Sequence, residues 1–410
     1  MKITKPELLM PAGNLETLKT AVIYGADAVY IGGEAFSLRA KADNFGPEVM
    51  KEAITFAHDR GCKVYITVNI FAHNRDLPEA AAYLRELKDI CPDALIMSDP
   101  GLMREARRIC PEIPIHVSTQ MNNTNYGIFN FWFDLGAERV VCARELTLEE
   151  IREIRANIPE EKEIEAFVHG AMCISYSGRC LLSSFMAGRD ANLGACTHPC
   201  RWNYALMEES RPGEYWPVTE NERGTFIFNS KDMCMIEHIP ELIEAGIDSF
   251  KVEGRMKTQL YVATVARTYR RAIDDYFEDP AKYRENLPLY REEVGKCTYR
   301  EYSTGFYFGR PGSEGQIYDC STYVKDYTYY GCVESVDADG AAHLVQKNKF
   351  SVGDEIEILK PDMTDIPVKV LSIKDEATGE EMGSCPHASQ RIIVTFSKAP
   401  VPGDILGGKA

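Results

Sequence analysis

The sequence lacks any long hydrophobic run. No stretch of about 18 or more apolar residues occurs in the chain, so no segment is predicted to span a membrane. The first seven residues, MKITKPE, also lack the apolar stretch of a secretory signal. We therefore expect a cytoplasmic protein that has no membrane partner.

Positive charge is also in short supply. The chain carries 46 Lys and Arg against 62 Asp and Glu, which gives a formal net charge of −16. An acidic chain repels phosphate overall, and this argues against non-specific binding of nucleic acid. A local basic site remains compatible with this composition.

Cysteine, in contrast, is abundant, with 13 residues. An odd number of cysteines without a secretory signal argues against a disulfide framework. Several of them stand singly in apolar surroundings and are predicted to be small core residues, namely Cys62, Cys91, Cys110 and Cys142.

Short apolar runs alternate with amphipathic stretches over residues 1–255. The apolar runs are continuous, as expected for parallel strands that are buried on both faces. They are Glu7–Met10, Ala28–Ile31, Lys63–Val68, Ala94–Met97, Pro114–Ser118, Arg139–Ala143, Ile164–Val168 and Ser249–Val252. The helical stretches that follow most of them are Leu15–Tyr24, Glu48–Arg60, Leu77–Cys91, Leu102–Ile109, Asn125–Leu135 and Leu148–Ala156.

This alternation predicts an α/β fold, a closed (β/α)₈ barrel of the TIM type, over residues 1–310. A long cysteine-rich loop, residues 171–230, interrupts the barrel after the seventh strand. Residues 311–330 are predicted to be a linker. Short strands with Gly, Asp and Pro turns then predict a small antiparallel β-barrel domain over residues 331–410. The predicted strands are Gly331–Val336, His343–Gln346, Glu355–Leu359, Val368–Ile373 and Ile392–Phe396.

Polar residues follow the strand runs where a barrel of this type places its chemistry. They are Asn69, Asp99, Gln120, Arg144, Glu145, His169, Glu253 and Arg255. The alternative explanation is that strand ends are polar because they meet solvent. It explains a single position well and a whole series of successive loops less well.

Four cysteines, Cys173, Cys180, Cys196 and Cys200, cluster in the long loop. Four thiolates so close in sequence suit an iron–sulfur cluster, and the absence of CxxC pairs makes zinc the weaker alternative. Packing of four nearby cysteines is a third alternative, and Cys234 is an alternative to Cys200 as the fourth ligand. His198 is a spare candidate.

The chain also lacks hydrolase motifs. Neither an HExxH zinc motif nor a GxSxG nucleophile motif occurs in it. A cysteine nucleophile with His169 as its base would be the remaining route to a protease. Such a protease would account for one of the four clustered cysteines, whereas cluster ligation accounts for all of them.

Several segments in a fixed order carry a family resemblance. They are Glu7–Gly13 (ELLMPAG), Phe36–Ala40 (FSLRA), Ser118–Asn122 (STQMN), Glu165–Cys173 (EAFVHGAMC), Ser177–Ser183 (SGRCLLS) and Lys251–Arg255 (KVEGR). Together they resemble the collagenase-like peptidase family, number thirty-two of the unassigned catalytic class, over nearly the whole chain. The segment Cys196–Trp202 (CTHPCRW) is most similar to the tRNA-hydroxylating branch of that family.

The resemblance implies an enzyme that makes 5-hydroxyuridine at the wobble position of tRNA without oxygen. Prephenate would be its co-substrate. A sister branch that holds a 4Fe-4S cluster on four cysteines implies such a cluster on Cys173, Cys180, Cys196 and Cys200. Other members hydroxylate a cytidine in ribosomal RNA, so an rRNA hydroxylase and the peptidase of the family name remain alternatives.

The expected site residues follow from these hypotheses. Glu165, Glu253 and His169 are candidates to move protons, and the two glutamates have a structural alternative as partners of Lys251 or Arg255. Four arginines are candidates to clamp the carboxylates of prephenate, namely Arg144, Arg179, Arg255 and, less strongly, Arg39.

RNA binding must come from local features of this acidic chain. Trp202 is a candidate to stack on an extruded base, together with Tyr176 and Tyr204. The densest basic stretch, which is otherwise a solvated barrel face, comprises Lys251, Arg255, Lys257, Arg267, Arg270 and Arg271. A protein partner is a further expectation.

Overall fold

A computed structural model describes most of the chain. The residues that it does not describe are 1–3, 35, 38–44, 174–179, 190, 192–194, 202–219, 222–223, 226–229, 312–322 and 410. The chain divides into two compact units. The first unit comprises residues 1–15, 27–256 and 300–323, and the second comprises residues 16–26, 257–299 and 324–410.

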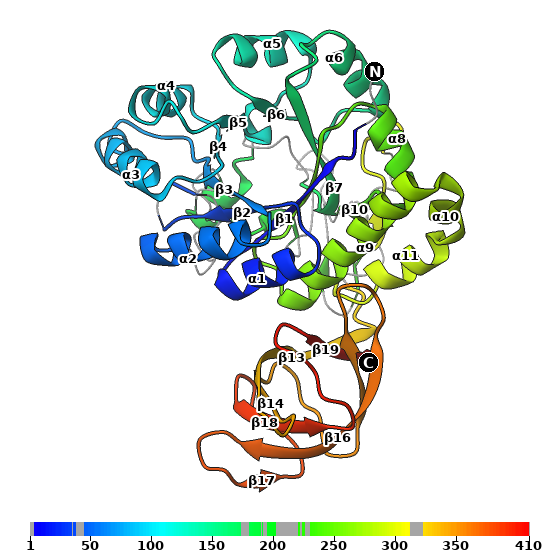
Figure 1. The fold of residues 1–410 in the computed structure, drawn as a ribbon. Coiled ribbons are helices and arrows are strands. Elements are labelled where there is room, and N and C mark those ends of the chain that lie inside the picture. The colour runs from blue at the N-terminus through cyan, green and yellow to red at the C-terminus, as the bar shows by residue number, and fades with distance from the viewer. Residues whose placement is uncertain are drawn as a thin grey trace, which may run out of the picture. The chain divides into compact units, whose positions relative to one another are not determined.

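Eight parallel strands form a closed barrel in the first unit, as the sequence predicts (Figure 1). They are β1 (Glu7–Pro11), β2 (Ala28–Gly32), β3 (Lys63–Val68), β4 (Ala94–Met97), β5 (Ile115–Val117), β6 (Arg139–Val141), β7 (Glu163–Ala171) and β11 (Ser249–Val252). The strands from β1 to β7 pair in chain order, and β11 closes the ring by pairing with both β1 and β7.

Helices follow the strands of the barrel. In the first unit they are α2 (Pro47–His58), α3 (Leu77–Ile90), α4 (Pro100–Ile109), α5 (Tyr126–Asp134), α6 (Leu148–Ala156) and α8 (Ile239–Glu244). Because these helices lie outside the ring, the strands are buried on both faces, which explains their continuous apolar runs (Figure 1). The barrel interior holds a compact apolar cluster of Leu9, Ala28, Tyr30, Tyr65, Ala94 and Ile96.

The predicted insertion lies between β7 and β11. Its described elements are α7 (Leu182–Ala187), β8 (Glu220–Asn221), β9 (Gly224–Thr225) and β10 (Asp232–Cys234), which α8 follows. Strand β10 pairs antiparallel with β7, and β12 (Tyr302–Ser303) pairs with β10. The insertion therefore returns to the barrel along the end of β7 before the last barrel strand begins.

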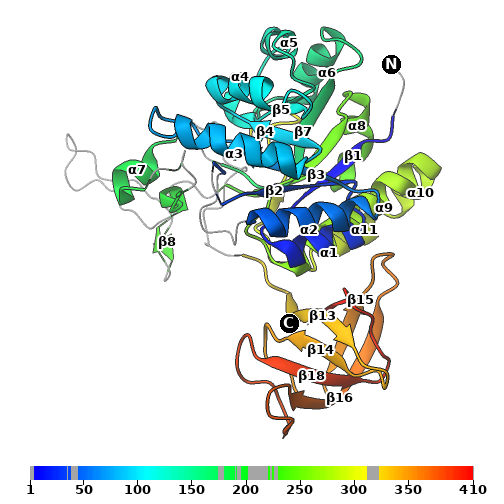
Figure 2. The same ribbon diagram turned by 60° about the vertical axis from the view of Figure 1, so that its left-hand side comes forward.

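The second unit contains four helices and a small barrel. The helices are α1 (Leu15–Ile23), which begins at the boundary between the units, α9 (Gln259–Glu278), α10 (Pro280–Glu285) and α11 (Leu287–Val294). The strands are β13 (Tyr327–Val336), β14 (Ala342–Val345), β15 (Glu355–Leu359), β16 (Ile366–Asp375), β17 (Glu381–Met382), β18 (Arg391–Phe396) and β19 (Ile405–Lys409). Six of them close into an antiparallel barrel, and β17 adds to β16 (Figure 2). This confirms the predicted antiparallel barrel.

Two local features of the fold differ from the sequence prediction. Strand β13 begins at Tyr327, within the range 311–330 that was predicted to be a linker. Cys91 is exposed rather than a core residue, because it ends α3 in a left-handed conformation with φ of 58°. Cys62, Cys110 and Cys142 are buried as predicted.

Candidate functional site

A cavity of about 230 Å³ opens at the carboxyl ends of the barrel strands. Each residue of its floor comes from a different strand, and we call this set the cavity floor: Tyr30, Thr67, Ile96, Val141, Phe167 and Lys251. The residues that follow the strands line the cavity above the floor, and the insertion supplies the remaining wall. The site therefore lies where a TIM-type barrel places its chemistry.

All four predicted cysteine ligands, Cys173, Cys180, Cys196 and Cys200, line this one cavity. The backbone N–H of His198 donates a hydrogen bond to Cys196 Sγ at 3.3 Å. Amide donors of this kind tune the properties of ligating sulfur atoms. Within the described residues, no group of three or more His, Cys, Asp or Glu is arranged to hold a metal ion.

The donor chemistry of the wall nevertheless fits an iron–sulfur cluster. Four thiols from one segment reach the same cavity, and thiolates are the ligands that such clusters use. Cys234 lies on β10, opposite His169 of β7, and is not one of the described residues that line the cavity. The geometry favours Cys200 over Cys234 as the fourth candidate.

Arg144 and Glu253 form an ion pair at the cavity wall. Arg144 Nη2 lies 3.0 Å from Glu253 Oε2, and the guanidinium stacks over the Phe167 ring, 3.9 Å from its centroid. Both side chains line the cavity, and their roles as carboxylate clamp and proton-transfer group stay predictions. The pair follows β6 and β11 and so connects two strand ends across β7.

Arg255 lines the cavity on the opposite side of β11, next to β2 and β3. Its Nη1 donates to Ser37 Oγ at 2.6 Å and to Thr67 Oγ1 at 3.1 Å. A Cβ on Gly32 would lie 1.9 Å from Arg255 Nη2, and one on Gly13 would lie 2.1 Å from the Arg255 carbonyl oxygen. Glycine is therefore required at Gly13, where a side chain would meet the backbone, and a side chain at Gly32 would displace the Arg255 guanidinium.

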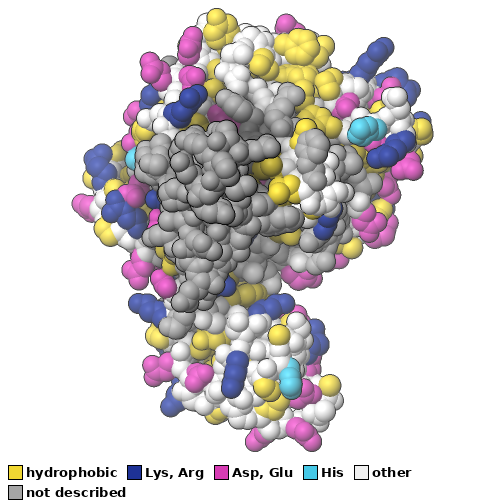
Figure 3. All heavy atoms as spheres, turned by 180° about the vertical axis from the view of Figure 1, so that it is seen from behind, with side chains coloured by type: hydrophobic (Ala, Val, Ile, Leu, Met, Phe, Trp, Pro, Cys, Tyr) yellow, Lys and Arg dark blue, Asp and Glu magenta, His cyan; other side chains and the backbone are white. Residues whose placement is uncertain are grey.

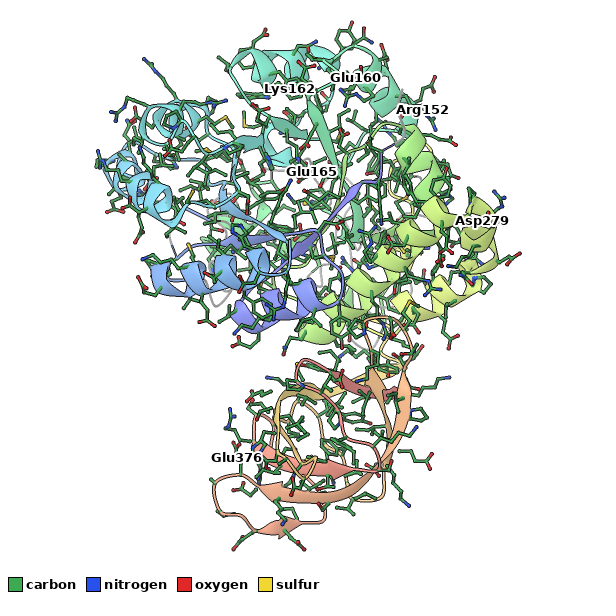
Figure 4. The ribbon with its side chains drawn as sticks, in the orientation of Figure 1. Arg152, Glu160, Lys162, Glu165, Asp279 and Glu376 are labelled. Carbon is green, nitrogen blue, oxygen red and sulfur yellow. The ribbon has the colours of Figure 1, made fainter. Side chains whose placement is uncertain are left out.

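Glu165 lies beneath the cavity floor and not in the cavity. It is fully buried, and Lys251 Nζ lies 2.5 Å from its Oε1. Its other oxygen lies 3.2 Å from Arg139 Nη1. Figure 4 places Glu165 in the middle of the barrel. The predicted catalytic glutamate thus reaches the cavity only through Lys251.

The ion network continues below Glu165. Arg139 Nη1 also lies 2.6 Å from Glu7 Oε1, and Glu163 accepts from the same guanidinium at 2.7 Å. Burial alone would raise the pKa of Glu7, but Arg139, with hydrogen bonds from Tyr65 and Ser249, holds it below its ordinary value. The network therefore keeps charged groups in a barrel interior that is otherwise largely apolar.

His169 is buried beside the cavity rather than in its described lining. Its ring lies 5.3 Å from the ring of Tyr302, between centroids. Three further candidates, Arg39, Arg179 and Trp202, lie outside the described residues, as do Tyr176 and Tyr204.

The predicted basic stretch is in large part buried or ion-paired. Lys251, Arg255 and Arg267 are buried, and Arg270 and Arg271 form ion pairs with acidic residues of their own helix, Asp274 and Asp275. On the described surface in Figure 3, basic and acidic side chains are interspersed. Three of the six cations of this stretch are therefore buried, and a role of the others in RNA binding stays a prediction.

Sequence reasoning named Gln120 among the polar residues that follow strands and Lys251 in the basic stretch, but it did not bring the two together in one site. Gln120 is 6% exposed and lines the cavity, and its Oε1 accepts hydrogen bonds from Ser98 at 3.0 Å and from Ser118 at 3.3 Å. Lys251 stands inside an apolar strand run. A charged residue in such a run needs a buried partner. This requirement was the feature of the sequence that could have marked Lys251 as a site residue.

An eight-stranded parallel barrel with a cavity at the carboxyl ends of its strands defines this chain as a TIM-barrel protein. The model of peptidase family U32 matches residues 13–317, and that of the peptidase family U32 C-terminal domain matches residues 325–406. The chain belongs to peptidase family U32. No helix in the described part of the chain is both long and apolar enough to cross a lipid bilayer.

Similar proteins include two that are named for tRNA hydroxylation. The tRNA hydroxylation protein P1 of Bacillus subtilis (strain 168) is 42% identical over 406 residues, which cover 98% of this chain and 94% of that protein. The tRNA hydroxylation protein P of Escherichia coli (strain K12) is 38% identical and covers 98% of this chain and 95% of that protein. The 23S rRNA 5-hydroxycytidine C2501 synthase of the same strain is 36% identical, over 67% of this chain and 40% of that protein.

Proposed function

We propose that this chain is an oxygen-independent RNA hydroxylase that forms 5-hydroxyuridine at the wobble position of tRNA. Prephenate would be its co-substrate, and Cys173, Cys180, Cys196 and Cys200 would hold a 4Fe-4S cluster. One observation carries the proposal, namely that all four cysteines line the same barrel-mouth cavity as Arg144, Lys251 and Arg255. A redox centre and an anion site would then share one space.

The charge of the cavity supports an anionic co-substrate. Three cations line it, Arg144, Lys251 and Arg255, against the single carboxylate of Glu253 among the described Asp and Glu residues. Apart from its cysteines, the lining is thus positive, whereas the whole chain has a net charge of −16, and the thiolates of a cluster would offset part of this positive charge. Arginine forks bind carboxylates in a bidentate manner, which suits a small dicarboxylic acid.

The cluster would supply the redox step that protein side chains cannot provide. The residues of the chain would bind and orient the reactants. Arg144 and Arg255 would hold carboxylates, and Glu253, beside Arg144, would accept or return a proton at its Oε2. The apolar floor residues would keep water away from the reacting atoms.

The names of the relatives favour tRNA as the substrate. The two proteins named for tRNA hydroxylation match 98% of this chain, whereas the ribosomal RNA enzyme matches 67% of it. The peptidase alternative would need His169 beside a cysteine nucleophile. Because His169 does not belong to the described lining of the cavity that the four cysteines share, this geometry gives the alternative no support.

Nucleoside mass spectrometry of tRNA and ribosomal RNA from a deletion strain tests the proposal. Hydroxyuridine-derived nucleosides of tRNA should disappear, return with the wild-type gene and stay absent with Cys173→Ser. Cys91→Ser is the control, because Cys91 is exposed and stands apart from the cavity lining. Unchanged tRNA would refute the function, and a change confined to ribosomal RNA would favour the alternative substrate.

The cluster needs a separate measurement. Protein purified without oxygen should contain iron and sulfide, and Cys173→Ser, Cys180→Ser, Cys196→Ser and Cys200→Ser should each lower the iron content. Cys91→Ser should retain it. Iron-free wild-type protein from oxygen-free preparations would refute the cluster.

A further inference from the structure

Lys251 is the one charged side chain of the cavity floor. Its Nζ lies 4.6 Å from the centroid of the Tyr30 ring and 5.5 Å from that of the Phe167 ring. In the part of the chain that the structure describes, Glu165 is the hydrogen-bond partner of this nitrogen. An ammonium group has three N–H donors, so donors remain that a ligand in the cavity can use.

The network beneath the floor fixes this ammonium in place. Glu165 is fully buried, accepts from Lys251 on one oxygen and lies against Arg139 with the other. A carboxylate held in this way cannot turn toward the cavity without breaking a buried ion pair, which is costly. The cation is therefore presented to the cavity, while its counter-charge stays below the floor.

We propose that Lys251 binds a carboxylate of the small-molecule co-substrate at the cavity floor, and that Glu165 is the positioning residue for its ammonium group. This inference rests on the proposed function, because it assigns a place to the co-substrate named there. It moves Glu165 from proton transfer to the support of a binding group.

A carboxylate fits the floor better than an RNA phosphate. A phosphate of RNA joins two sugars, so it can reach a buried floor only if the chain enters and leaves through the same cavity. A carboxylate stands at the end of a small molecule, so it can enter the cavity first and reach the floor. Lys251 is only 5% exposed, which restricts its ligands to such end groups.

Gln120 supplies a second donor to the same space. Two hydroxyl groups, those of Ser98 and Ser118, donate to its Oε1 and so fix the orientation of the amide. Its Nε2 makes no hydrogen bond to any described residue, although the side chain is more than nine-tenths buried and lines the cavity. A buried amide of this kind is expected to donate to a ligand oxygen.

The placement also orients the ligand. Lys251 lies within a strand, whereas the four cysteines lie in the insertion beyond the strand ends. A molecule whose carboxylate rests on Lys251 would therefore direct its other end toward the cysteine wall. The specificity of the site would then depend on the length of the molecule between these two ends.

Calorimetric titration of the anaerobically purified full chain with prephenate tests the inference. The main variant is Lys251→Met combined with Glu165→Gln, which removes both charges and avoids an unpaired buried carboxylate. Lys251→Arg retains a cation at the floor. Lys162→Met is the control, because Lys162 also pairs with a glutamate, the exposed Glu138 at 2.9 Å, but lies away from the cavity lining (Figure 4).

We expect the Kd of prephenate to rise by about tenfold or more in the double variant, and to stay within about twofold of wild type in Lys162→Met. Lys251→Arg should restore part of the affinity. If the double variant lowers the thermal midpoint of the ligand-free protein, the same titration is done with Lys251→Gln. This variant retains a hydrogen-bond donor for Glu165.

Three outcomes overturn the inference. These are wild-type affinity in a folded double variant, absence of prephenate binding to wild type, and an equal loss of affinity for inorganic phosphate, which would indicate a general anion site. Failure of the proposed function would give a different experimental result from these three outcomes. Wild type would then bind prephenate in a Lys251-dependent manner but leave tRNA unmodified, and the carboxylate site would stand.

Discussion

Arg139 holds three carboxylates together inside the barrel. Its guanidinium contacts Glu7, Glu163 and Glu165, and its own side chain is 3% exposed. Glu165 is fully buried, so this carboxylate depends on Arg139 and Lys251 for compensation of its charge. Removal of Arg139 would therefore destabilise the fold mainly because buried carboxylates would lose a counter-charge.

We predict that Arg139→Met lowers the free energy of unfolding by about 3–5 kcal/mol, because the fully buried Glu165 and the largely buried Glu7 each lose a cation. Urea-induced unfolding measures this change. Arg152→Met is the control, since Arg152 is an exposed residue of α6 and points outward in Figure 4; its effect should stay within about 0.5 kcal/mol. Similar effects of the two substitutions would contradict the network.

His116 lies close to the buried ion network of Arg139 and Lys251, and it is neutral in the folded protein. Its ring meets Tyr65 edge-on at 4.7 Å between centroids. Burial, and then the positive charges of Arg139 and Lys251, hold the pKa of His116 well below its ordinary value. The unfolded chain takes up this proton below about pH 6.5, so the fold loses stability as the pH falls through that region.

We predict that His116→Phe, which keeps a ring against Tyr65, weakens this pH dependence. Above about pH 6.5 the histidine contributes no pH dependence, and below it the free energy of unfolding of wild type should fall by up to about 1.4 kcal/mol per pH unit from this group. Urea titrations at a series of pH values measure the difference between the two proteins. A difference that stays constant across the series would show that His116 is not the titrating group.

Some individual residues of the candidate site could be predicted from the sequence. Arg144, Glu253 and Arg255 follow strands, so the rule that barrel chemistry lies at carboxyl ends located them. Glu165 and Lys251 lie within strands, and in a parallel sheet buried on both faces the apolar pattern does not show which side chains point inward. The sequence left Lys251 and Arg255 open as structural partners of the glutamates, and the structure pairs Glu165 with Lys251 across the neighbouring strands β7 and β11.

At the scale of elements, prediction from periodicity was successful. All eight barrel strands lie where continuous apolar runs predicted them, and their ends differ by a few residues. Strand β19 was not predicted, because it contains Gly407 and Gly408, which disfavour strands. A Cβ on Gly407 would lie 2.3 Å from the Tyr327 ring, so packing in the second unit requires glycine there.

Helix α6 shows how a local signal fixes an element boundary. Glu150 N–H donates to Thr147 Oγ1 at 3.2 Å, and the Thr147 N–H donates to Glu150 Oε2 at 2.8 Å. This capping box satisfies donors that the first turn of a helix otherwise leaves without partners.

We predict that Thr147→Ala lowers the free energy of unfolding by about 1 kcal/mol, because the α6 N-terminus loses its side-chain acceptor. Thr147→Ser retains the hydroxyl and should leave stability near that of wild type. Thermal unfolding of the three proteins measures the effect. If serine were as destabilising as alanine, the methyl group of Thr147 rather than the cap would be responsible.

On the scale of the whole molecule, chain order and spatial grouping differ. Residues 16–26 and 257–299 group with the C-terminal strands, although the sequence places them in the barrel repeat. Tyr24 illustrates the reason, since its hydroxyl donates to the Leu359 carbonyl at 2.7 Å. Contacts between segments so distant in sequence leave no periodic signal, so composition and patterning did not predict this grouping.

An ion cluster inside the second unit ties its helices to its strands. Arg267 of α9 lies 2.6 Å from Asp365 and also pairs with Glu293 of α11. Lys296 lies 3.0 Å from Asp365, which precedes β16. Burial would raise the pKa of Asp365, but Arg267 and Lys296 hold it below its ordinary value, so the cluster stabilises the unit until the pH falls into the acidic range.

If this cluster holds the second unit together, neutralising Asp365 must weaken helices and strands alike. We predict that Asp365→Asn lowers the free energy of unfolding by about 1–3 kcal/mol, because Arg267 is fully buried and loses a charged partner. Asp362→Asn, in the same turn but exposed, should have a smaller effect. Hydrogen exchange should show faster exchange in both α9 and β16 for Asp365→Asn, and faster exchange in the strands alone would mean that helices and strands open independently.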